Sequence, residues 1–399
     1  MKQKWIKLLL LGAFLLLFGY FAFQAVNSIP SEYDSITYHI PLAKSILNGR
    51  IFYPDKLHFP NSTFPAASEL ILALLLFFHI PLNLFNIIAW IVLIYLLFRL
   101  GNAYKLKQST YIFVLSIITL PTIVRLLLTQ TVDVWFAVFF VWVLLLFQKP
   151  EKKIGYFFQL GLSMGLLIGS KYSGPLFLSA LIFVYGKKVA SYLSFVRFVY
   201  LFIPFSIFGL SWYIRNILVY ANPLYPAPFM WMNGTSAFSP EVFLSHFKMI
   251  TSVENGLLYS VNAILSEYLF WPFIIILGIL FVKKSNKDQT IINEKGRLLT
   301  LGLIGIIIYL VIPGYAYNYN NYVSEIRYSI PIIISYILLF FYYIRKTALL
   351  RFIPLFVFLN FIALFTLFFY GEYHPKIIVI IGITIFLCIK IYFAIKQKN

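Results

Sequence analysis

Long apolar runs, separated by short clusters of charged residues or of Gly, Pro and Asn, follow one another along almost the whole chain. A helix needs about 20 apolar residues to cross the hydrocarbon core of a bilayer, and most of the runs approach that length. The pattern therefore predicts an all-α polytopic membrane protein with about twelve transmembrane helices. The runs cover residues 5–23, 83–100, 109–127, 133–148, 155–170, 174–186, 195–212, 260–282, 298–313, 329–344, 350–369 and 376–395.

The composition excludes a soluble globular protein. Of the 399 residues, 61% are hydrophobic and only 11% are charged, whereas soluble domains are about half apolar and about a quarter charged. The net charge of +19 does not indicate nucleic-acid binding, because Lys and Arg fall in short clusters between the apolar runs. The single cysteine, Cys388, lies in the last apolar run, so neither an intrachain disulfide nor a cysteine metal site is expected.

The membrane topology depends on one further apolar run, residues 65–79, which is short and contains Pro65 and Glu69. If this run lies on the outer surface without crossing, all basic clusters fall on one face, which the positive-inside rule makes cytoplasmic. We therefore expect a multi-pass protein of the cytoplasmic membrane with both termini in the cytoplasm. The clusters are Lys2/Lys4/Lys7, Arg99/Lys105/Lys107, Lys149/Lys152/Lys153, Lys187/Lys188, Lys283/Lys284/Lys287, Arg345/Lys346 and Lys396/Lys398.

The less apolar segments define the expected organisation. We expect one integral membrane domain over residues 1–399, without a soluble C-terminal domain. Residues 24–82 then form a first outer loop with amphipathic or re-entrant juxtamembrane helices, and residues 213–259 form a second long outer loop. Long loops in compact proteins often carry function, so the chemistry is expected on this face.

The first outer loop contains an acidic residue, Asp34, that could take part in catalysis. Pro30 follows the first apolar run, and Asp34 precedes a segment with the polar residues Tyr38 and His39 and an apolar stripe. An amphipathic helix of this kind would hold Asp34 at the membrane surface. The alternative is that Asp34 only caps the helix.

A second acid, Asp133, opens a strongly apolar span on the same predicted face. Two acids that lie close together at the edge of the membrane, where little water is present, can shift each other's pKa. The alternative is that Asp133 is a helix cap. Three cations also lie on this face, Lys171, Arg215 and Arg327, where the positive-inside rule disfavours them. Arg offers a planar fork suited to phosphate oxygens, while the simpler interpretations are a snorkelling Lys171 and an ion pair for Arg327.

Together these motifs resemble the GT-C membrane glycosyltransferases. The likeness is closest to the bacterial branch related to protein O-mannosyltransferases and aminoarabinose lipid A transferases, and it covers about residues 1–345. The segments that carry it are Tyr33 to Pro41, Thr131 to Asp133, Ser170 to Gly174, Trp212 to Asn216 with Asn222 to Pro226, and Glu325 to Pro331.

The resemblance implies an inverting transfer of a hexose or pentose from a polyprenyl-phosphate sugar to a lipid, glycan or protein hydroxyl at the outer face. It makes Asp34 the catalytic base and Asp133 a second acid, and it implies that no metal is required. The basic residues would bind the donor phosphate, and aromatic and polar neighbours would line the substrate pocket. The basic residues are Lys171, Arg215 and Arg327, and the pocket residues are Tyr38, His39, Tyr172, Asn216 and Tyr328.

Two departures accompany the resemblance. Many relatives have an Asp-Glu pair in the first loop, whereas Ser35 follows Asp34 here. Many relatives also carry a soluble C-terminal domain, which leaves the acceptor open.

The residues agree with sugar transfer independently of the resemblance. An inverting transfer needs one base and stabilisation of the departing phosphate, which needs no general acid. The main alternative is a secondary transporter or a flippase for lipid-linked glycans, since twelve spans are common among transporters. Against it, the spans are nearly free of charge and show no similarity between the two halves. A ligase or polymerase of surface glycans is a third alternative.

Overall fold

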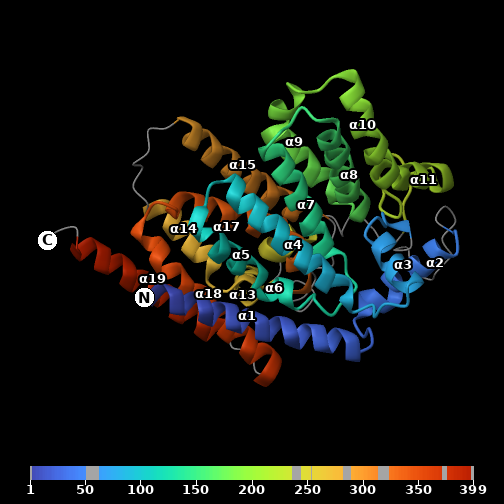
Figure 1. Cartoon of the computed structure of the whole chain (residues 1–399). Coiled ribbons are helices and arrows are strands. Elements are labelled where there is room, and N and C mark those ends of the chain that lie inside the picture. Colours follow the sequence, from blue (N-terminus) through green and yellow to red (C-terminus); the bar gives the residue numbers. More distant parts are fainter. Residues whose placement is uncertain are drawn as a thin grey trace.

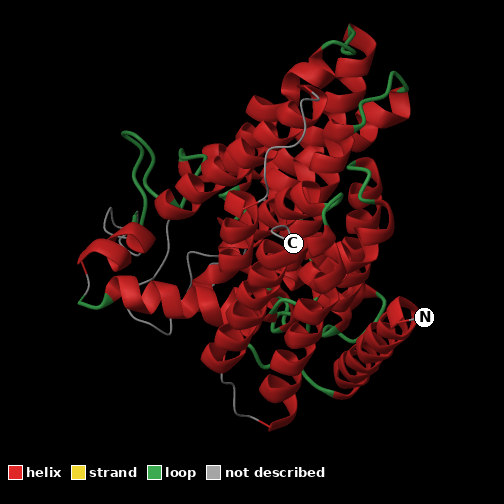
Figure 2. Cartoon of the chain, turned by 90° about the vertical axis from the view of Figure 1, so that its left-hand side faces the viewer, coloured by secondary structure: helices red, strands yellow, loops and turns green. Residues whose placement is uncertain are grey.

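The computed structural model describes residues 2–50, 63–235, 244–252, 254–281, 289–312, 323–370 and 375–396. Helices joined by short loops make up almost all of this part of the chain, and Figure 2 shows that no strand interrupts them there. Within the same residues, one isolated bridge between Phe229 and Met232 is the only strand-like pairing.

The α-helices have the following bounds, and Figure 1 labels most of them. In the first half of the chain they are α1 (Lys2–Asn27), α2 (Ile40–Leu47), α3 (Glu69–Phe77), α4 (Leu84–Ala103), α5 (Thr110–Ile118), α6 (Pro121–Val124), α7 (Asp133–Gln148), α8 (Ile154–Ser170) and α9 (Gly174–Ala190). They continue with α10 (Phe195–Phe205), α11 (Ser211–Tyr220), α12 (Ser245–Ser252), α13 (Gly256–Tyr268), α14 (Trp271–Phe281), α15 (Gln289–Val311), α17 (Ile330–Ile344), α18 (Ile353–Phe365) and α19 (Pro375–Lys396).

Several of these helices begin or end in a short 3₁₀-helix or π-helix. The 3₁₀-helices are η3 (Lys107–Ser109), η7 (Ile326–Ser329) and η8 (Ala348–Phe352). The π-helices are η1 (Ser35–His39), η4 (Ser206–Leu210) and η9 (Thr366–Tyr370). Because η4 joins α10 to α11 without a break, residues 195–220 form one long helical span.

The prediction of an all-α polytopic membrane protein is confirmed. Six helical segments in the described part are long and apolar enough to cross a membrane, or seven if α13 and α14 count as one bent span. Every predicted run is helical where it is described, but two runs are not single helices. The run 109–127 breaks where Leu120 is extended before Pro121, since proline disfavours a helical residue before it. The run 260–282 bends by 93° between α13 and α14.

The centre of the bundle is formed by α7 and α17. Most side chains of both helices are buried. Helix α7 packs against α4, α8, α9 and α17, and α17 packs also against α5, α14 and α15. A helix that is apolar all round is expected in such a position. Features at the ends of α7 and α17 are therefore held by the most rigid part of the fold.

The short run 65–79 does not carry the chain across the bundle. Its helix α3 has nine residues, which span only about 14 Å, half of a bilayer core. The Asn83 side-chain amide at the start of α4 donates to the Ser28 carbonyl, just beyond α1, at 3.0 Å. The chain therefore leaves α1 and enters α4 at the same end, as the non-crossing interpretation requires. Helices α2 and α3 lie at this end, on the right of Figure 1.

Basic residues meet at the opposite end. Lys188, near the end of α9, pairs with Glu294 of α15 at 2.8 Å. Arg345, just after α17, donates to the carbonyl of Tyr104, just after α4, at 2.9 Å. The hydroxyls of Tyr104 and Tyr185 lie 3.0 Å apart and connect these two contacts, so the ends of α4, α9, α15 and α17 meet at one end of the bundle. The basic residues around them then share one face, as the predicted topology requires.

Helix α8 approaches its neighbour closely through a stripe of glycines. A Cβ built on Gly161 would overlap the Leu201 carbonyl oxygen, one on Gly165 would lie 3.0 Å from that of Pro204, and one on Gly169 would overlap that of Phe208. Glycines four residues apart share a helix face, and in membranes they allow backbones to touch. This stripe fixes residues 195–210 against α8.

Replacing Gly161 by alanine is expected to destabilise the protein, because the new methyl group meets backbone that cannot move like a side chain. Overpacking of this kind costs about 1–3 kcal/mol. Thermal unfolding of the purified variant in detergent should show a lower Tm. Gly155→Ala, on the same helix, is the matched control, since no atom lies within 4 Å of its added methyl group. Equal Tm values for the two variants would contradict close packing at Gly161.

Candidate active site

Four charged side chains from distant parts of the chain meet at the end of the bundle where α2 and α3 lie. Arg327 donates from Nη2 to Asp34 Oδ2 at 2.5 Å, and its Nε lies 3.5 Å from Asp133 Oδ2. Lys171 donates from Nζ to Asp133 Oδ1 at 2.5 Å. Two carboxylates and two cations thus alternate in one chain of ion pairs, and their charges cancel. We call these four residues the ion cluster.

Each member of the ion cluster stands at a helix end. Asp34 precedes the π-helix η1, and Asp133 is the first residue of α7, where the helix dipole favours a negative charge. Lys171 directly follows α8, and Arg327 lies in η7, which leads into α17. Because α7 and α17 are the central helices, Asp133 and Arg327 are the firmly placed members.

The four side chains of the ion cluster differ in solvent exposure. The side chain of Asp133 is 4% exposed, that of Arg327 14%, that of Lys171 21% and that of Asp34 25%. A buried charge without partners is strongly destabilising, so Asp133 depends on its two cations. Asp34 is the more exposed of the two acids.

Ser35 anchors the backbone beside Asp34. Its hydroxyl donates to Glu32 Oε2 at 2.6 Å and accepts from the backbone N–H of Gln130 at 2.8 Å. The first outer loop is thereby tied to the turn that precedes Asp133. The neighbouring π-helix η1 is a rare form that often occurs at functional sites.

Two of the predicted pocket tyrosines adjoin the ion cluster. Lys171 Nζ lies 3.8 Å from the ring centroid of Tyr328, a cation–π contact. Burial and the nearby Asp34 carboxylate hold the pKa of Tyr38 well above its usual value, so its hydroxyl remains a hydrogen-bond donor. Burial lowers the pKa of Lys171, and the Asp133 carboxylate acts in the opposite direction.

His39, another predicted pocket residue, makes a buried pair. Its Nδ1 lies 2.7 Å from Glu69 Oε1, and both side chains are 3% exposed. Glu69 Oε2 is buried and has no hydrogen-bond partner in the described part of the chain. Glu69 was not predicted as a site residue, although a carboxylate inside the apolar run 65–79 was a usable indication. The pair joins η1 to the first residue of α3.

The other predicted residues come together in a separate network. The buried Arg215 donates to the carbonyl oxygens of Thr63 and Phe64 and to the side-chain oxygen of Asn216. The Asn216 amide in turn donates to the Tyr172 hydroxyl at 2.8 Å. This network holds residue 63 against α11. None of the bonds described joins Arg215 to the ion cluster, so donor-phosphate binding by Arg215 stays a prediction.

Two more contacts between ionisable side chains were not predicted. His246 Nε2 of α12 lies 3.0 Å from Glu325 Oε2, which connects the second outer segment to the residues just before η7. Arg125 donates to Glu267 Oε1 at 2.6 Å. Sequence alone could not pair them, because their partners lie far apart along the chain. Among the described residues, no group of three or more His, Cys, Asp or Glu side chains could hold a metal ion.

The arrangement suits chemistry on an anionic substrate. Lys171 and Arg327 supply two cations in one place, and both are mostly buried, where electrostatic interactions are stronger than in water. Arg327 Nε is buried, makes no hydrogen bond within the described residues and lies 3.5 Å from Asp133 Oδ2, while Nη2 holds the more exposed Asp34. A carboxylate within reach of the same Arg can accept a proton.

The comparisons with known proteins support the fold. The structure is similar to the crystal structure of ArnT from Cupriavidus metallidurans in the apo state, with a TM-score of 0.55 and 11% sequence identity. ArnT is an aminoarabinose lipid A transferase and a GT-C enzyme. The match covers 91% of this chain, which spans 64% of the length of that enzyme. No family model and no curated protein matches the sequence. The chain therefore has a GT-C-like fold, as the motifs implied.

Replacing Asp133 by asparagine is expected to destabilise the protein, because Lys171 and Arg327 would face each other with only Asp34 as counter-ion. Removing one partner of a buried ion pair costs about 3–5 kcal/mol. The Tm of the purified variant in detergent should fall.

A double variant provides the control for this prediction. Asp133→Asn with Lys171→Met removes one acid and one cation together, so its Tm should recover part of the loss. A double-mutant cycle with Lys171→Met alone measures the coupling. A coupling energy of zero would mean that the two side chains do not stabilise each other.

Proposed function

We propose that the protein is an inverting GT-C glycosyltransferase that moves a sugar from a polyprenyl-phosphate donor to a hydroxyl group of a lipid, glycan or protein. The observation that carries the proposal is the ion cluster, in which the accessible carboxylate of Asp34 shares Arg327 with a buried acid beside a second cation. The GT-C-like fold and the first-loop position of Asp34 support the same assignment.

The cations are proposed to bind the donor phosphate. Arg327 presents a planar fork whose Nη2 holds the more exposed Asp34, and Lys171 lies on the other side of Asp133 as a point charge. The phosphate gains negative charge as its bond to the sugar breaks. Preorganised cations at this place stabilise the transition state more than the ground state, which is the requirement for catalysis.

Asp34 is proposed to be the general base. The acceptor oxygen forms a bond to the anomeric carbon while Asp34 takes the acceptor proton. The bond between that carbon and the phosphate oxygen breaks, and its electron pair leaves with the polyprenyl phosphate. Attack opposite to the leaving group inverts the configuration. One base is sufficient, because a phosphate leaves without protonation.

The ion pair of Asp34 with Arg327 offers a way to couple the two events. The oxygen of Asp34 that accepts from Arg327 is occupied by that hydrogen bond. When donor phosphate binds to Arg327, it competes with Asp34 for the same nitrogen atoms. Asp34 Oδ2 is then released for the acceptor hydroxyl when the donor is bound.

The predicted topology supports an extracytoplasmic position for the proposed reaction. The ion cluster lies at the end of the bundle opposite to the basic residues around Lys188 and Arg345. With those residues in the cytoplasm, the reaction takes place on the extracytoplasmic face of the cytoplasmic membrane, with both termini in the cytoplasm. The charged residues lie at helix ends rather than in the middle of spans, which favours an enzyme over a transporter.

Asp34→Asn is expected to lower turnover by about 10²–10⁴-fold, the usual contribution of a general base. Release of polyprenyl phosphate from a panel of polyprenyl-phosphate sugars, with the purified full chain and an acceptor extract, measures this. The Tm should stay close to that of the unmodified protein. Glu254→Gln, at an exposed acid, is the matched control and should keep full turnover. Sugar transfer by Asp34→Asn at the original rate would exclude Asp34 as the base. Movement of the lipid-linked sugar across a vesicle membrane without bond cleavage would favour a transporter.

Turnover is expected to continue after EDTA treatment, because Lys171 and Arg327 supply the positive charge at the proposed phosphate site. The assay is the same release of polyprenyl phosphate, with and without chelator. Loss of turnover in EDTA that returns on addition of Mg²⁺ or Mn²⁺ would show that a metal ion takes part.

A further inference from the structure

Two cations lie close together at the basic end of the bundle, opposite to the ion cluster. Arg345 directly follows α17, and its Cζ lies 3.8 Å from the ring centroid of Tyr342. Lys295, on α15, has its Nζ 3.9 Å from the ring centroid of Tyr343 on α17. Helices α15 and α17 pack against each other. Both cations therefore lie where these two helices meet, which we call the α15–α17 seam.

The two cations at the seam repel each other. Burial and the Arg345 guanidinium both lower the pKa of Lys295, because each disfavours its positive charge. The neighbouring acid, Glu294, is engaged elsewhere, since it pairs with Lys188 at 2.8 Å and also with Arg297. Within the described part of the chain, no carboxylate forms an ion pair with Lys295 or Arg345. The seam thus carries two positive charges that an anionic ligand would stabilise.

The donors at the seam suit a phosphate group. An Arg side chain has five N–H donors and a Lys side chain has three. Among the described residues, the hydrogen bond of the Arg345 guanidinium is the one from Nη1 to the Tyr104 carbonyl, at 2.9 Å. A phosphate offers several acceptor oxygens, and charge-assisted hydrogen bonds from Arg and Lys to phosphate are strong.

The seam cations stand at the level of the lipid headgroups. The span Val323–Ile344 ends one residue before Arg345. On α15 the apolar part of the helix begins at Leu298, three residues after Lys295. Tyrosines such as Tyr342 and Tyr343 are typical of the membrane–water interface. A phospholipid headgroup in the leaflet at this end of the bundle is therefore within reach of both cations.

An exposed apolar face of α15 continues from Lys295 into the membrane. Four side chains, each between 40% and 60% exposed, follow Lys295 at spacings of about one helical turn and so share its side of the helix. From Lys295 the face runs along about 18 Å of helix, close to the roughly 15 Å thickness of one leaflet of the hydrocarbon core. The four residues are Leu299, Leu303, Ile306 and Ile307.

Helix α17 forms the adjoining side of this face. A Cβ built on Gly302 would lie 2.7 Å from the Tyr336 ring, and one on Gly305 would lie 2.9 Å from the Ile332 side chain. These two glycines let α17 approach α15 closely beside the exposed residues. The apolar face therefore follows the seam rather than an isolated helix.

We propose that the seam binds one anionic phospholipid, with its phosphate between Lys295 and Arg345 and one acyl chain along the exposed face of α15. A basic site between membrane helices is a general way to bind an anionic headgroup. The two positive charges select a lipid with a net negative charge, because they repel the ammonium group of a zwitterionic lipid. The proposal is independent of the proposed function.

A soluble phosphate has the same headgroup chemistry as the lipid. It could contact Lys295 and Arg345, but it would gain nothing from the apolar face of α15. The lipid gains from both parts of the site, since its acyl chain covers apolar side chains while its phosphate contacts the cations. Affinity for the whole lipid should therefore exceed affinity for the phosphate alone.

The first test measures lipid binding. The full chain in a non-ionic detergent is titrated with phosphatidylglycerol or with phosphatidylcholine of the same acyl chains, and bound lipid is counted by native mass spectrometry. We expect tighter binding of phosphatidylglycerol. In Lys295→Gln its Kd should rise about fivefold, the usual contribution of one Lys to the binding of anionic lipid. Lys187→Gln, at an exposed Lys of the same end, is the matched control and should leave the Kd unchanged.

Two results of this titration would overturn the proposal. One is equal affinity of the unmodified protein for the two lipids, and the other is an unchanged Kd for phosphatidylglycerol in Lys295→Gln. Inorganic phosphate is added in a third arm. Displacement of phosphatidylglycerol by an equal concentration of inorganic phosphate would assign the cations to a soluble anion and reject the lipid site.

The second test uses the unmodified protein, so it does not depend on the folding of a variant. Phosphatidylglycerol with a photoreactive group in its acyl chain is cross-linked to the full chain in phospholipid nanodiscs, and labelled peptides are identified by mass spectrometry. We expect adducts on residues 299–307 that excess phosphatidylglycerol removes and excess phosphatidylcholine does not. Absence of these adducts, or their equal removal by both lipids, would refute a specific site.

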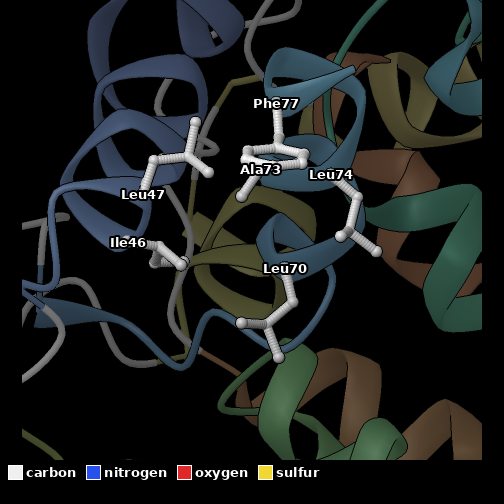
Figure 3. Close-up of a pocket in the computed structure, with 6 residues that line it drawn as sticks. All are labelled: Ile46, Leu47, Leu70, Ala73, Leu74 and Phe77. Atoms are coloured by element: carbon white, nitrogen blue, oxygen red, sulfur yellow. The ribbon is translucent and has the colours of Figure 1, made fainter.

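The groove between α2 and α3, at the other end of the bundle, provides an internal comparison. Figure 3 shows that side chains from both helices line it, and all of them are hydrocarbon. Since no cation lines this groove, adducts there should be removed equally by the two phospholipids. Selective removal of those adducts by phosphatidylglycerol would show that the selectivity does not come from Lys295 and Arg345. The lining residues are Ile46, Leu47, Leu70, Ala73, Leu74 and Phe77.

Discussion

The contact of Arg327 with both Asp34 and Asp133 is the interaction on which the rest of this site depends. Charged groups near the hydrocarbon region of a membrane are costly unless they are paired. Arg327 and Asp133 begin the two central helices, so their contact sets the relative position of α17 and α7. Asp34 is then placed against this rigid pair from a surface loop. A single side chain therefore connects the core of the bundle to its most accessible acid.

The first outer loop is held at several separate points. Ser35 is bonded to the turn before α7, His39 to the start of α3, and Asp34 to Arg327. The residues before α3 are bonded to the end of α8. Since only the contact to Arg327 involves the accessible carboxylate, a phosphate can take this contact over while the other bonds keep the loop in place. Asp34 can then change partners without a large movement of its backbone.

The apolar runs were sufficient to predict the all-α membrane fold, because a span must satisfy its backbone within one helix. The lengths of the runs alone could not predict the break before Pro121 or the bend between α13 and α14. Asp34, Asp133, Lys171 and Arg327 could be proposed as a group because cations on the outer face need anionic partners. Which partner each one has depends on packing between distant segments. For the same reason Glu69 was missed as the partner of His39. Arg215 was predicted to bind the donor phosphate, and its described bonds go to Thr63, Phe64 and Asn216.

The charge balance of the ion cluster explains why one acid in the first loop is enough. Ser35 is fully buried and bonded to Glu32 and to the backbone of Gln130, so a second carboxylate at this position would be a buried charge without a cation. In the proposed reaction the donor phosphate gains one negative charge when the sugar leaves. Asp34 loses one negative charge in the same step, because it takes the acceptor proton. The total charge near Arg327 and Lys171 therefore stays constant from bound substrate to product.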